Sequence, residues 1–210
     1  MIKRILLLAI TGLMVCSMSF AKKDLPRVKI MLKDSTSVEG YLRSELSDRD
    51  TIIAISPEQK GKKIKYDIKK VEKLLLLSQT DSDKTAEYYP LYVYSSMRSG
   101  KGSISDHPMM LLLAYAGKHV NGYVGFVWVF NSVAWNLEPI AYYKLAESEV
   151  AKPFLNFGTI FRKSKSGMIN SFKEYPALTE KLENETLSAK DINRDPMLIV
   201  KELDKILDTK

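Results

Sequence analysis

The stretch that most restricts how this chain can fold is Met109–Phe130, MMLLLAYAGKHVNGYVGFVWVF, in which Lys118 is the only charged residue. A run this apolar has to be hidden from water, either in a lipid bilayer or in a protein core. A membrane-spanning helix needs about 20 consecutive apolar residues. Glycines and polar residues between Gly117 and Gly122 interrupt the run and divide it into two halves, each as long as a buried strand. The sequence therefore favours a β-hairpin in a protein core over a membrane element.

Two positions can supply the turn of this hairpin. Asn121-Gly122 can adopt the positive φ angles of a two-residue turn. Gly117 offers an alternative turn a few residues earlier. The pattern predicts the hairpin and leaves its register open between these two turns.

Met1–Ala21 has the form of a secretory signal peptide. Lys3 and Arg4 precede a short apolar segment, and small residues lie just before Lys22, which predicts cleavage after Ala21. The alternative is a lipoprotein anchored at Cys16, but Val15 stands where that processing normally requires a small side chain. Either way, we expect export to the periplasm or the cell surface.

Cleavage after Ala21 would also remove the only cysteine, Cys16. The mature chain would then have no disulfide, no thiolate zinc ligand and no cysteine nucleophile. Its 189 residues, from Lys22 to Lys210, are enough for one medium domain or two small ones.

Positive charge is concentrated between Lys60 and Lys73, where seven lysines are accompanied only by Asp67 and Glu72. The whole chain has a formal net charge of +7, which falls to +5 without the signal peptide. Such a lysine face commonly protects strand edges from aggregation. The alternative is a binding surface that includes Lys62, Lys63 and Lys65, and export then favours an anionic glycan or lipid headgroup over nucleic acid.

Residues 22–77 are predicted to form a small SH3-like β-barrel. The expected strands are short and closely spaced, and Gly40 inside the second one indicates a bulge or sharp bend. They are Val28–Leu32, Ser37–Leu46, Thr51–Ser56, Lys62–Tyr66 and Ile68–Leu77.

The segments VKIMLKDSTSVEGYLRSEL and TIIAIS resemble the first strands of Sm-like and related SH3-type barrels. RNA binding by the Sm family also uses an Arg or Lys followed by Gly in a late strand, and Lys62–Leu77 contains no such pair. We therefore transfer no RNA-binding residue, and we expect no nucleic-acid partner.

The second half of the chain is predicted to be an antiparallel sheet packed by C-terminal helices. Residues 78–87 read as a polar linker, and residues 88–210 as the sheet followed by helices from about Arg162 onward. Asn131–Pro139 is expected to connect two strands, and the apolar helix faces to cover the sheet. The predicted fold class is thus α+β, with a separate N-terminal barrel.

The wider layout resembles a family of exported Bacteroidetes proteins of unknown function. The resemblance rests on the signal peptide, the VKIMLKDSTSVEGYLRSEL opening, the segments LLLAYAGKHV and AYYKL, and the closing FKEYPALTEKLENETLSAKDI. It implies a compartment and an architecture, but no activity.

No motif for catalysis, for cofactor binding or for a metal site stands out. The two histidines, His107 and His119, lack metal-ligand spacing, and no Gly-x-Ser-x-Gly or phosphate-loop pattern occurs. We therefore predict a non-enzymatic protein-interaction or structural module of the envelope. The alternatives are a binding protein for anionic glycan or lipid headgroups and, third, an envelope hydrolase.

Several side chains around the central hairpin are candidates for a binding surface, either for an envelope protein or for a glycan. Tyrosine and tryptophan offer rigid contact area with a polar handle, although core packing is the alternative role for such rings. The candidates are His119, Asn121, Tyr123, Trp128 and Trp135.

Overall fold

The computed structural model describes residues 25–77, 85–94, 103–130, 132–156 and 165–209. The predicted signal peptide and residues 78–84 of the predicted linker lie outside the described residues. The strands are β1 (Arg27–Leu32), β2 (Ser37–Leu42), β3 (Ile52–Ser56), β4 (Ile64–Asp67), β5 (Val71–Leu77), β6 (Thr85–Val93), β7 (Met109–Tyr115), β8 (Val120–Phe130), β9 (Trp135–Leu145) and β10 (Val150–Asn156). The helices are the 3-10 helix η1 (Ile68–Lys70) and the α-helices α2 (Lys165–Ser171), α3 (Pro176–Glu183), α4 (Ala189–Arg194) and α5 (Leu198–Asp208).

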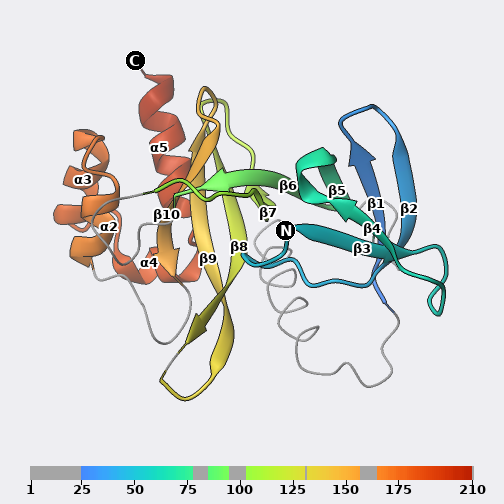
Figure 1. Ribbon diagram of the computed structural model, residues 1–210. Helices are drawn as coiled ribbons and strands as arrows, with labels where there is room; N and C mark the ends of the chain where they lie inside the picture. Colours follow the sequence, from blue (N-terminus) through green and yellow to red (C-terminus); the bar gives the residue numbers. More distant parts are fainter. Residues whose placement is uncertain (1–24, 78–84, 95–102, 131, 157–164, 210) are drawn as a thin grey trace.

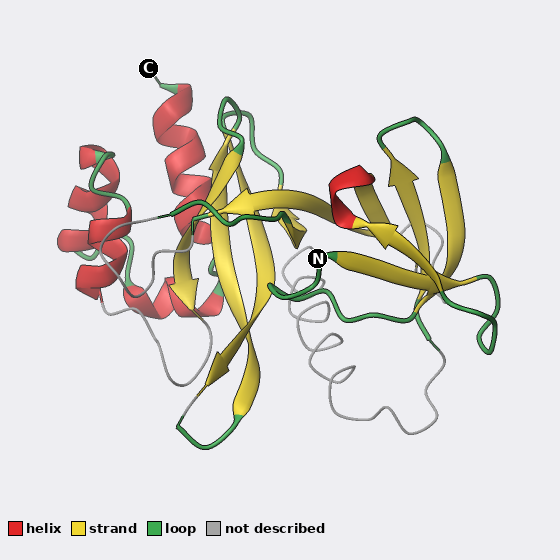
Figure 2. Ribbon diagram, viewed as in Figure 1, coloured by secondary structure: helices red, strands yellow, loops and turns green. Residues whose placement is uncertain are grey.

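The predicted α+β fold with a separate SH3-like barrel is wrong. All ten described strands belong to one mixed sheet in the order β10-β9-β8-β7-β6-β5-β1-β2-β3-β4, and 48% of the described residues are strand and 21% helix (Figures 1 and 2). The N-terminal strands do not close into a barrel of their own, because both edges of β5 are paired. It pairs with β1 on one side and with β6 on the other, from Leu74↔Tyr88 to Leu77↔Thr85, so the N-terminal strands continue into the rest of the sheet.

Strands β6 to β10 curl into a ring. β10 is antiparallel to β9, and its start also pairs in parallel with the end of β6, at Val150↔Tyr92 and Ala151↔Val93. The side chains that cluster inside include Leu111, Tyr123 and Tyr142, all at most 4% exposed. Because the sheet twists until β10 pairs with β6, the inner face of these strands is buried by the sheet itself and needs no helices to cover it.

A second cluster fills the N-terminal part of the sheet and joins it to the ring. Val28, Ile30 and Ile53 are fully buried there, and Tyr88 of β6 and Met110 of β7 pack into the same cluster. Apolar contact therefore continues across the β5–β6 boundary together with the hydrogen bonds.

Gly40 lies in β2 where β3 crosses closest to it. A Cβ atom on Gly40 would be 2.6 Å from the main-chain oxygen of Ser56, which has no room to move because Ser56 is buried. We therefore expect Gly40→Ala to lower the free energy of unfolding by about 2 kcal/mol, the usual cost of overpacking. Urea unfolding followed by circular dichroism measures this. Gly61→Ala, in a more open turn, is the matched control, and equal losses in the two variants would contradict the account.

The helices pack on the outer surface of β8, β9 and β10, on the side opposite the N-terminal strands (Figure 1). Phe172, Leu178 and Leu203 are fully buried in the cluster between helices and strands. No described helix has both the length and the apolar character needed to cross a membrane.

The turn of the central hairpin lies at Gly117, and the alternative turn at Asn121-Gly122 is wrong. β7 ends at Tyr115, β8 begins at Val120, and Gly122 pairs with Tyr115 inside the strands. The Asn121 side chain accepts a hydrogen bond from the Gly117 amide at 3.1 Å, so it stabilises the turn from within β8.

The connection expected at Asn131–Pro139 is much shorter than predicted. β8 and β9 pair as far as Phe130↔Trp135, so Trp135–Pro139 is strand. Proline is rarely found inside a strand that is paired on both sides, and Pro139 stands at the end of the expected connection. Here it pairs with Phe126 in the outer part of the hairpin.

Candidate functional site

The lysine-rich segment turns sharply at Asp67, and this turn shapes the candidate site. β4 ends at Asp67, whose side chain accepts a hydrogen bond from the Lys69 amide at 2.8 Å and caps η1. A capping residue of this kind accepts a hydrogen bond from a main-chain amide at the start of a helix and so fixes the point at which the helix follows the strand. Lys65 of β4 and Lys69 of η1 consequently line the same surface depression.

We call this surface the basic depression and define it by two adjoining hollows that share Lys69. The larger hollow has a volume of about 350 Å³ and is lined by Thr51, Ile52, Lys65, Asp67, Lys69 and His107. The smaller hollow, of about 250 Å³, is lined by Leu32, Lys33, Asp34, Lys69 and Lys70. Both are open to solvent. Because they are open, they could contact a charged group on a larger ligand but would not enclose a small molecule.

The acidic side chains of the basic depression are occupied by their own turns. Asp34 accepts hydrogen bonds from the Thr36 hydroxyl at 2.6 Å and the Thr36 amide at 3.0 Å. These bonds hold the pKa of Asp34 below its usual value. Asp34 and Asp67 therefore accept their hydrogen bonds from main-chain amides and a hydroxyl, while the charge of Lys70 adds only a smaller contribution to the lowered pKa of Asp34.

The lysines of the basic depression lack ion-pair partners within the described part of the chain. Two other lysines of the N-terminal strands are paired, since Lys29 contacts Glu39 and Lys73 contacts Glu87, each at 3.5 Å. Among the residues that the structure describes, no ion pair involves Lys33, Lys65, Lys69 or Lys70. Four lysines therefore lie there with only two carboxylates, Asp34 and Asp67, and the excess of positive charge is of the kind that attracts anions.

His107 reaches the basic depression from the loop before β7. Its Nε2 lies 2.9 Å from the main-chain oxygen of Asp48, and its Nδ1 lies 2.8 Å from the carboxylate of Asp106. Both partners are acceptors, so both contacts are hydrogen bonds only when the ring carries two protons and a positive charge. The bond from His107 holds the pKa of Asp106 below its usual value.

The structure places the sequence-predicted surface residues in four separate regions. Lys65 lines the basic depression, while Lys62 and Lys63 are exposed just before β4. Tyr123 is 4% exposed inside the ring, where burial raises its pKa. Trp128 and Trp135 lie on the β8–β9 hairpin, with the Arg49 guanidinium 5.8 Å and 3.9 Å from their ring centres.

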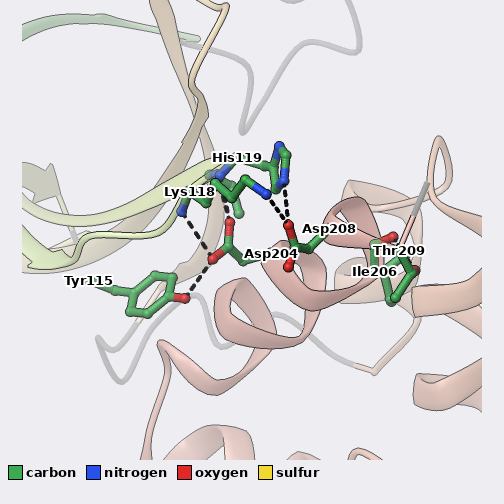
Figure 3. Close-up of polar contacts among 8 residues, drawn as sticks. Tyr115, Lys118, His119, Asp204, Ile206, Asp208 and Thr209 are labelled. Carbon is green, nitrogen blue, oxygen red and sulfur yellow. Dashed lines mark hydrogen bonds and ion pairs between the residues drawn. The ribbon is translucent and has the colours of Figure 1, made fainter.

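His119 lies in the turn between β7 and β8, which α5 holds in place (Figure 3), and Asn121 lies near the start of β8. The Asp204 carboxylate accepts hydrogen bonds from the amides of Lys118, His119 and Val120, at 3.2, 2.7 and 3.1 Å. The Tyr115 hydroxyl donates a fourth at 2.8 Å. His119 Nε2 lies 3.2 Å from Asp208 Oδ1 (Figure 3). These contacts anchor the helix to the sheet, and His119 and Asn121 are occupied by the turn itself.

Sequence reasoning missed several residues of the basic depression. Lys69 and Lys70 were visible as part of a lysine run, and Asp67 before them was the signal of a capped turn. Lys33, Thr51 and His107 come from other parts of the chain, and only the sheet order brings them to the same surface.

No set of three side chains that could hold a metal ion occurs within the described ranges. Comparison with protein-family models, with curated proteins and with solved structures finds no match. The resemblance to exported Bacteroidetes proteins therefore stays a prediction.

Proposed function

We propose that the protein is an exported, non-enzymatic interaction module of the cell envelope and that it binds anionic groups in the basic depression. The observation that carries this proposal is the excess of positive charge around two adjoining hollows, where Lys33, Lys65, Lys69 and Lys70 outnumber Asp34 and Asp67 and form no ion pair among the described residues. Export rests on the predicted signal peptide.

The surroundings of the two histidines favour binding over hydrolysis. A hydrolase of the Ser-His-Asp type directs one imidazole nitrogen at its nucleophile and the other at a carboxylate. His107 has the carboxylate contact, but its Nε2 faces the main-chain oxygen of Asp48. His119 directs Nε2 at Asp208. Among the residues that the structure describes, neither ring makes a hydrogen bond with a hydroxyl group.

The ligand chemistry follows from the type and spacing of the cations. Lysine ammonium groups act as mobile point charges and suit phosphate, sulfate or carboxylate groups that arrive from solvent. Anionic glycans and anionic lipid headgroups both present such groups in series. A surface of several lysines would bind them additively and with a strong dependence on salt.

We expect Lys65→Ala/Lys69→Ala to weaken binding to dextran sulfate by about thirtyfold, since each lysine near an anionic surface contributes about 1 kcal/mol and about 1.4 kcal/mol is a tenfold change. Isothermal titration calorimetry at low and high salt measures this, with uncharged dextran as the blank. Phosphatidylglycerol vesicles form the second arm, which distinguishes lipid headgroups from glycans.

Lys173→Ala/Lys190→Ala removes the same net charge from the exposed surface of the helical region and is the matched control. It should change the affinity by less than about twofold. Equal losses in the two double variants, or binding that salt does not weaken, would contradict a localised anion site.

A further inference from the structure

The outer half of the β8–β9 hairpin extends beyond the rest of the sheet (Figure 1). β8 pairs with β7 only between Gly122 and Val124, whereas it pairs with β9 along its whole length to Phe130. Around the outer half, the chain segment at Ser47 and Asp48 contacts β8 at Phe126 and Trp128. The end of the hairpin is thus a convex, two-stranded projection.

This projection presents apolar side chains to solvent. Val133 is 88% exposed, Trp135 53% and Phe130 45%. These three account for nearly half of the large exposed apolar side chains among the described residues. The sequence from Asn121 to Leu137 contains no charged residue. An uncharged end can therefore leave water without the cost of desolvating an ion.

The side chains along the projection are ordered by polarity. Val133 lies in the connection, and the rings of Phe130 and Trp135 follow, with their centres 5.4 Å apart. The Arg49 guanidinium lies 3.9 Å from the centre of the Trp135 ring and 5.8 Å from that of Trp128, which lies farther from the end of the hairpin. Lipid bilayers change from hydrocarbon to a zone that favours tryptophan and then to phosphate groups that bind cations. The order of side chains matches that order of layers.

We infer that the end of the β8–β9 hairpin inserts into the interface of a lipid bilayer, with Val133 deepest, the Phe130–Trp135 pair at the interface and Arg49 at the headgroup phosphates. The convex shape favours this occupant. A protein partner would need a complementary cavity, while a bilayer adapts to a protruding apolar end. This site is separate from the basic depression, because its contacts are apolar and require no net negative charge on the membrane.

Vesicles of phosphatidylcholine, which carry no net charge, test the inference separately from the anion-binding proposal. In the full chain Trp128→Phe leaves Trp135 as the sole tryptophan, because the sequence has two. With vesicles, its emission should shift to shorter wavelength and acrylamide should quench it less. Without vesicles, the emission should not depend on protein concentration.

In the same background, Val133→Asp should lower the vesicle-bound fraction in flotation at least about tenfold, because a carboxylate is costly below the headgroups. Val133 is so exposed that the variant should unfold at the same urea concentration as its parent. Ile104→Asp is the matched control, because Ile104 is 52% exposed but lies outside the hairpin. It should bind vesicles like its parent.

Three results would overturn the inference: absence of vesicle binding, equal binding by the Val133→Asp variant, or equal loss with Ile104→Asp. A concentration-dependent Trp135 shift without vesicles would assign the projection to contact between two copies and would overturn it as well. Loss of dextran sulfate binding alone would leave the vesicle result unchanged, so the two proposals fail separately.

Discussion

Phe172→Ala is expected to lower the free energy of unfolding by about 4 kcal/mol, the largest effect among the substitutions considered for this protein. Phe172 is fully buried, and its ring centre lies 4.8 Å from that of Tyr143 and 5.5 Å from that of Phe154. The alanine variant would lose these contacts and leave a cavity between helix and sheet. Urea unfolding followed by far-UV circular dichroism measures the loss.

Phe130→Ala makes the same substitution at a residue that is 45% exposed. It should cost less than about 1 kcal/mol, because little apolar area is returned to water. If Phe172→Ala proved no more costly than Phe130→Ala, the helices would not cover the sheet as described.

Asp204→Ala is expected to cost about 3 kcal/mol, because one carboxylate satisfies three main-chain amides of the β7–β8 turn and the Tyr115 hydroxyl. Asp204→Asn should cost less, since its amide oxygen can still accept while its NH₂ group cannot. Asp208→Ala removes a carboxylate one turn later on the same helix and should have a much smaller effect, because its contacts are exposed. Equal losses at both positions would contradict the anchoring role of Asp204.

The loss of stability in the Asp204 variants should depend on pH, and the pKa of Asp204 gives the direction of that dependence. Burial raises the pKa of Asp204, but the hydrogen bonds from the His119 amide, the Tyr115 hydroxyl and the other two amides outweigh burial and lower it overall. A lowered pKa in the folded state stabilises the protein fully above the unfolded-state value, which is about 3.9. This stabilisation is lost as the pH falls through the lower folded-state value. The difference between wild type and Asp204→Asn should therefore be constant near neutral pH and shrink below about pH 4.

Deprotonation of Tyr115 sets the high-pH end of the range in which its hydrogen bond to Asp204 can form. Burial, followed by its hydrogen bond to Asp204, raises the pKa of Tyr115 to about 12. A raised pKa stabilises the protein fully below the unfolded-state value of about 10 and loses that effect as the pH rises through the folded-state value. The contact between Tyr115 and Asp204 is thus intact throughout the physiological range.

Local patterns in the sequence located most strands and helices, because alternation and helical spacing are properties of neighbouring residues. They could not show that β5 pairs with β6 or that β10 returns to β6. Those pairings join residues as far apart as Tyr92 and Val150, and no local pattern specifies them. The predicted fold class was wrong because it did not include these two strand pairings.

The choice of hairpin turn depended on a similarly distant residue. Asn121-Gly122 has the better local turn chemistry, yet Asp204, more than eighty residues away, holds the amides of the turn next to Gly117. A Cβ atom on Gly117 would lie 2.5 Å from the Asp204 carboxylate, so a glycine is required at that position. The tertiary contact therefore outweighs local preference.

The candidate site could be predicted in part. The lysine run identified the region and Lys65 within it, while aromatic content pointed to the central hairpin. The sequence could not show that Asp34 and Asp67 are occupied by their own turns, or that Lys33 and His107 join Lys69. The site depends on which lysines form no ion pair in the folded protein, and composition alone does not show which lysines these are.

The central claim is that anions bind at the basic depression. Its most direct test is a titration of the isotope-labelled chain from Lys22 to Lys210 with a sulfated oligosaccharide, followed by amide chemical shifts in two-dimensional NMR. The account predicts that the largest shift changes fall on Thr51, Lys65, Lys69 and His107, and that added salt reverses them. Changes spread evenly over every lysine-bearing surface, or centred on another face of the sheet, would contradict it.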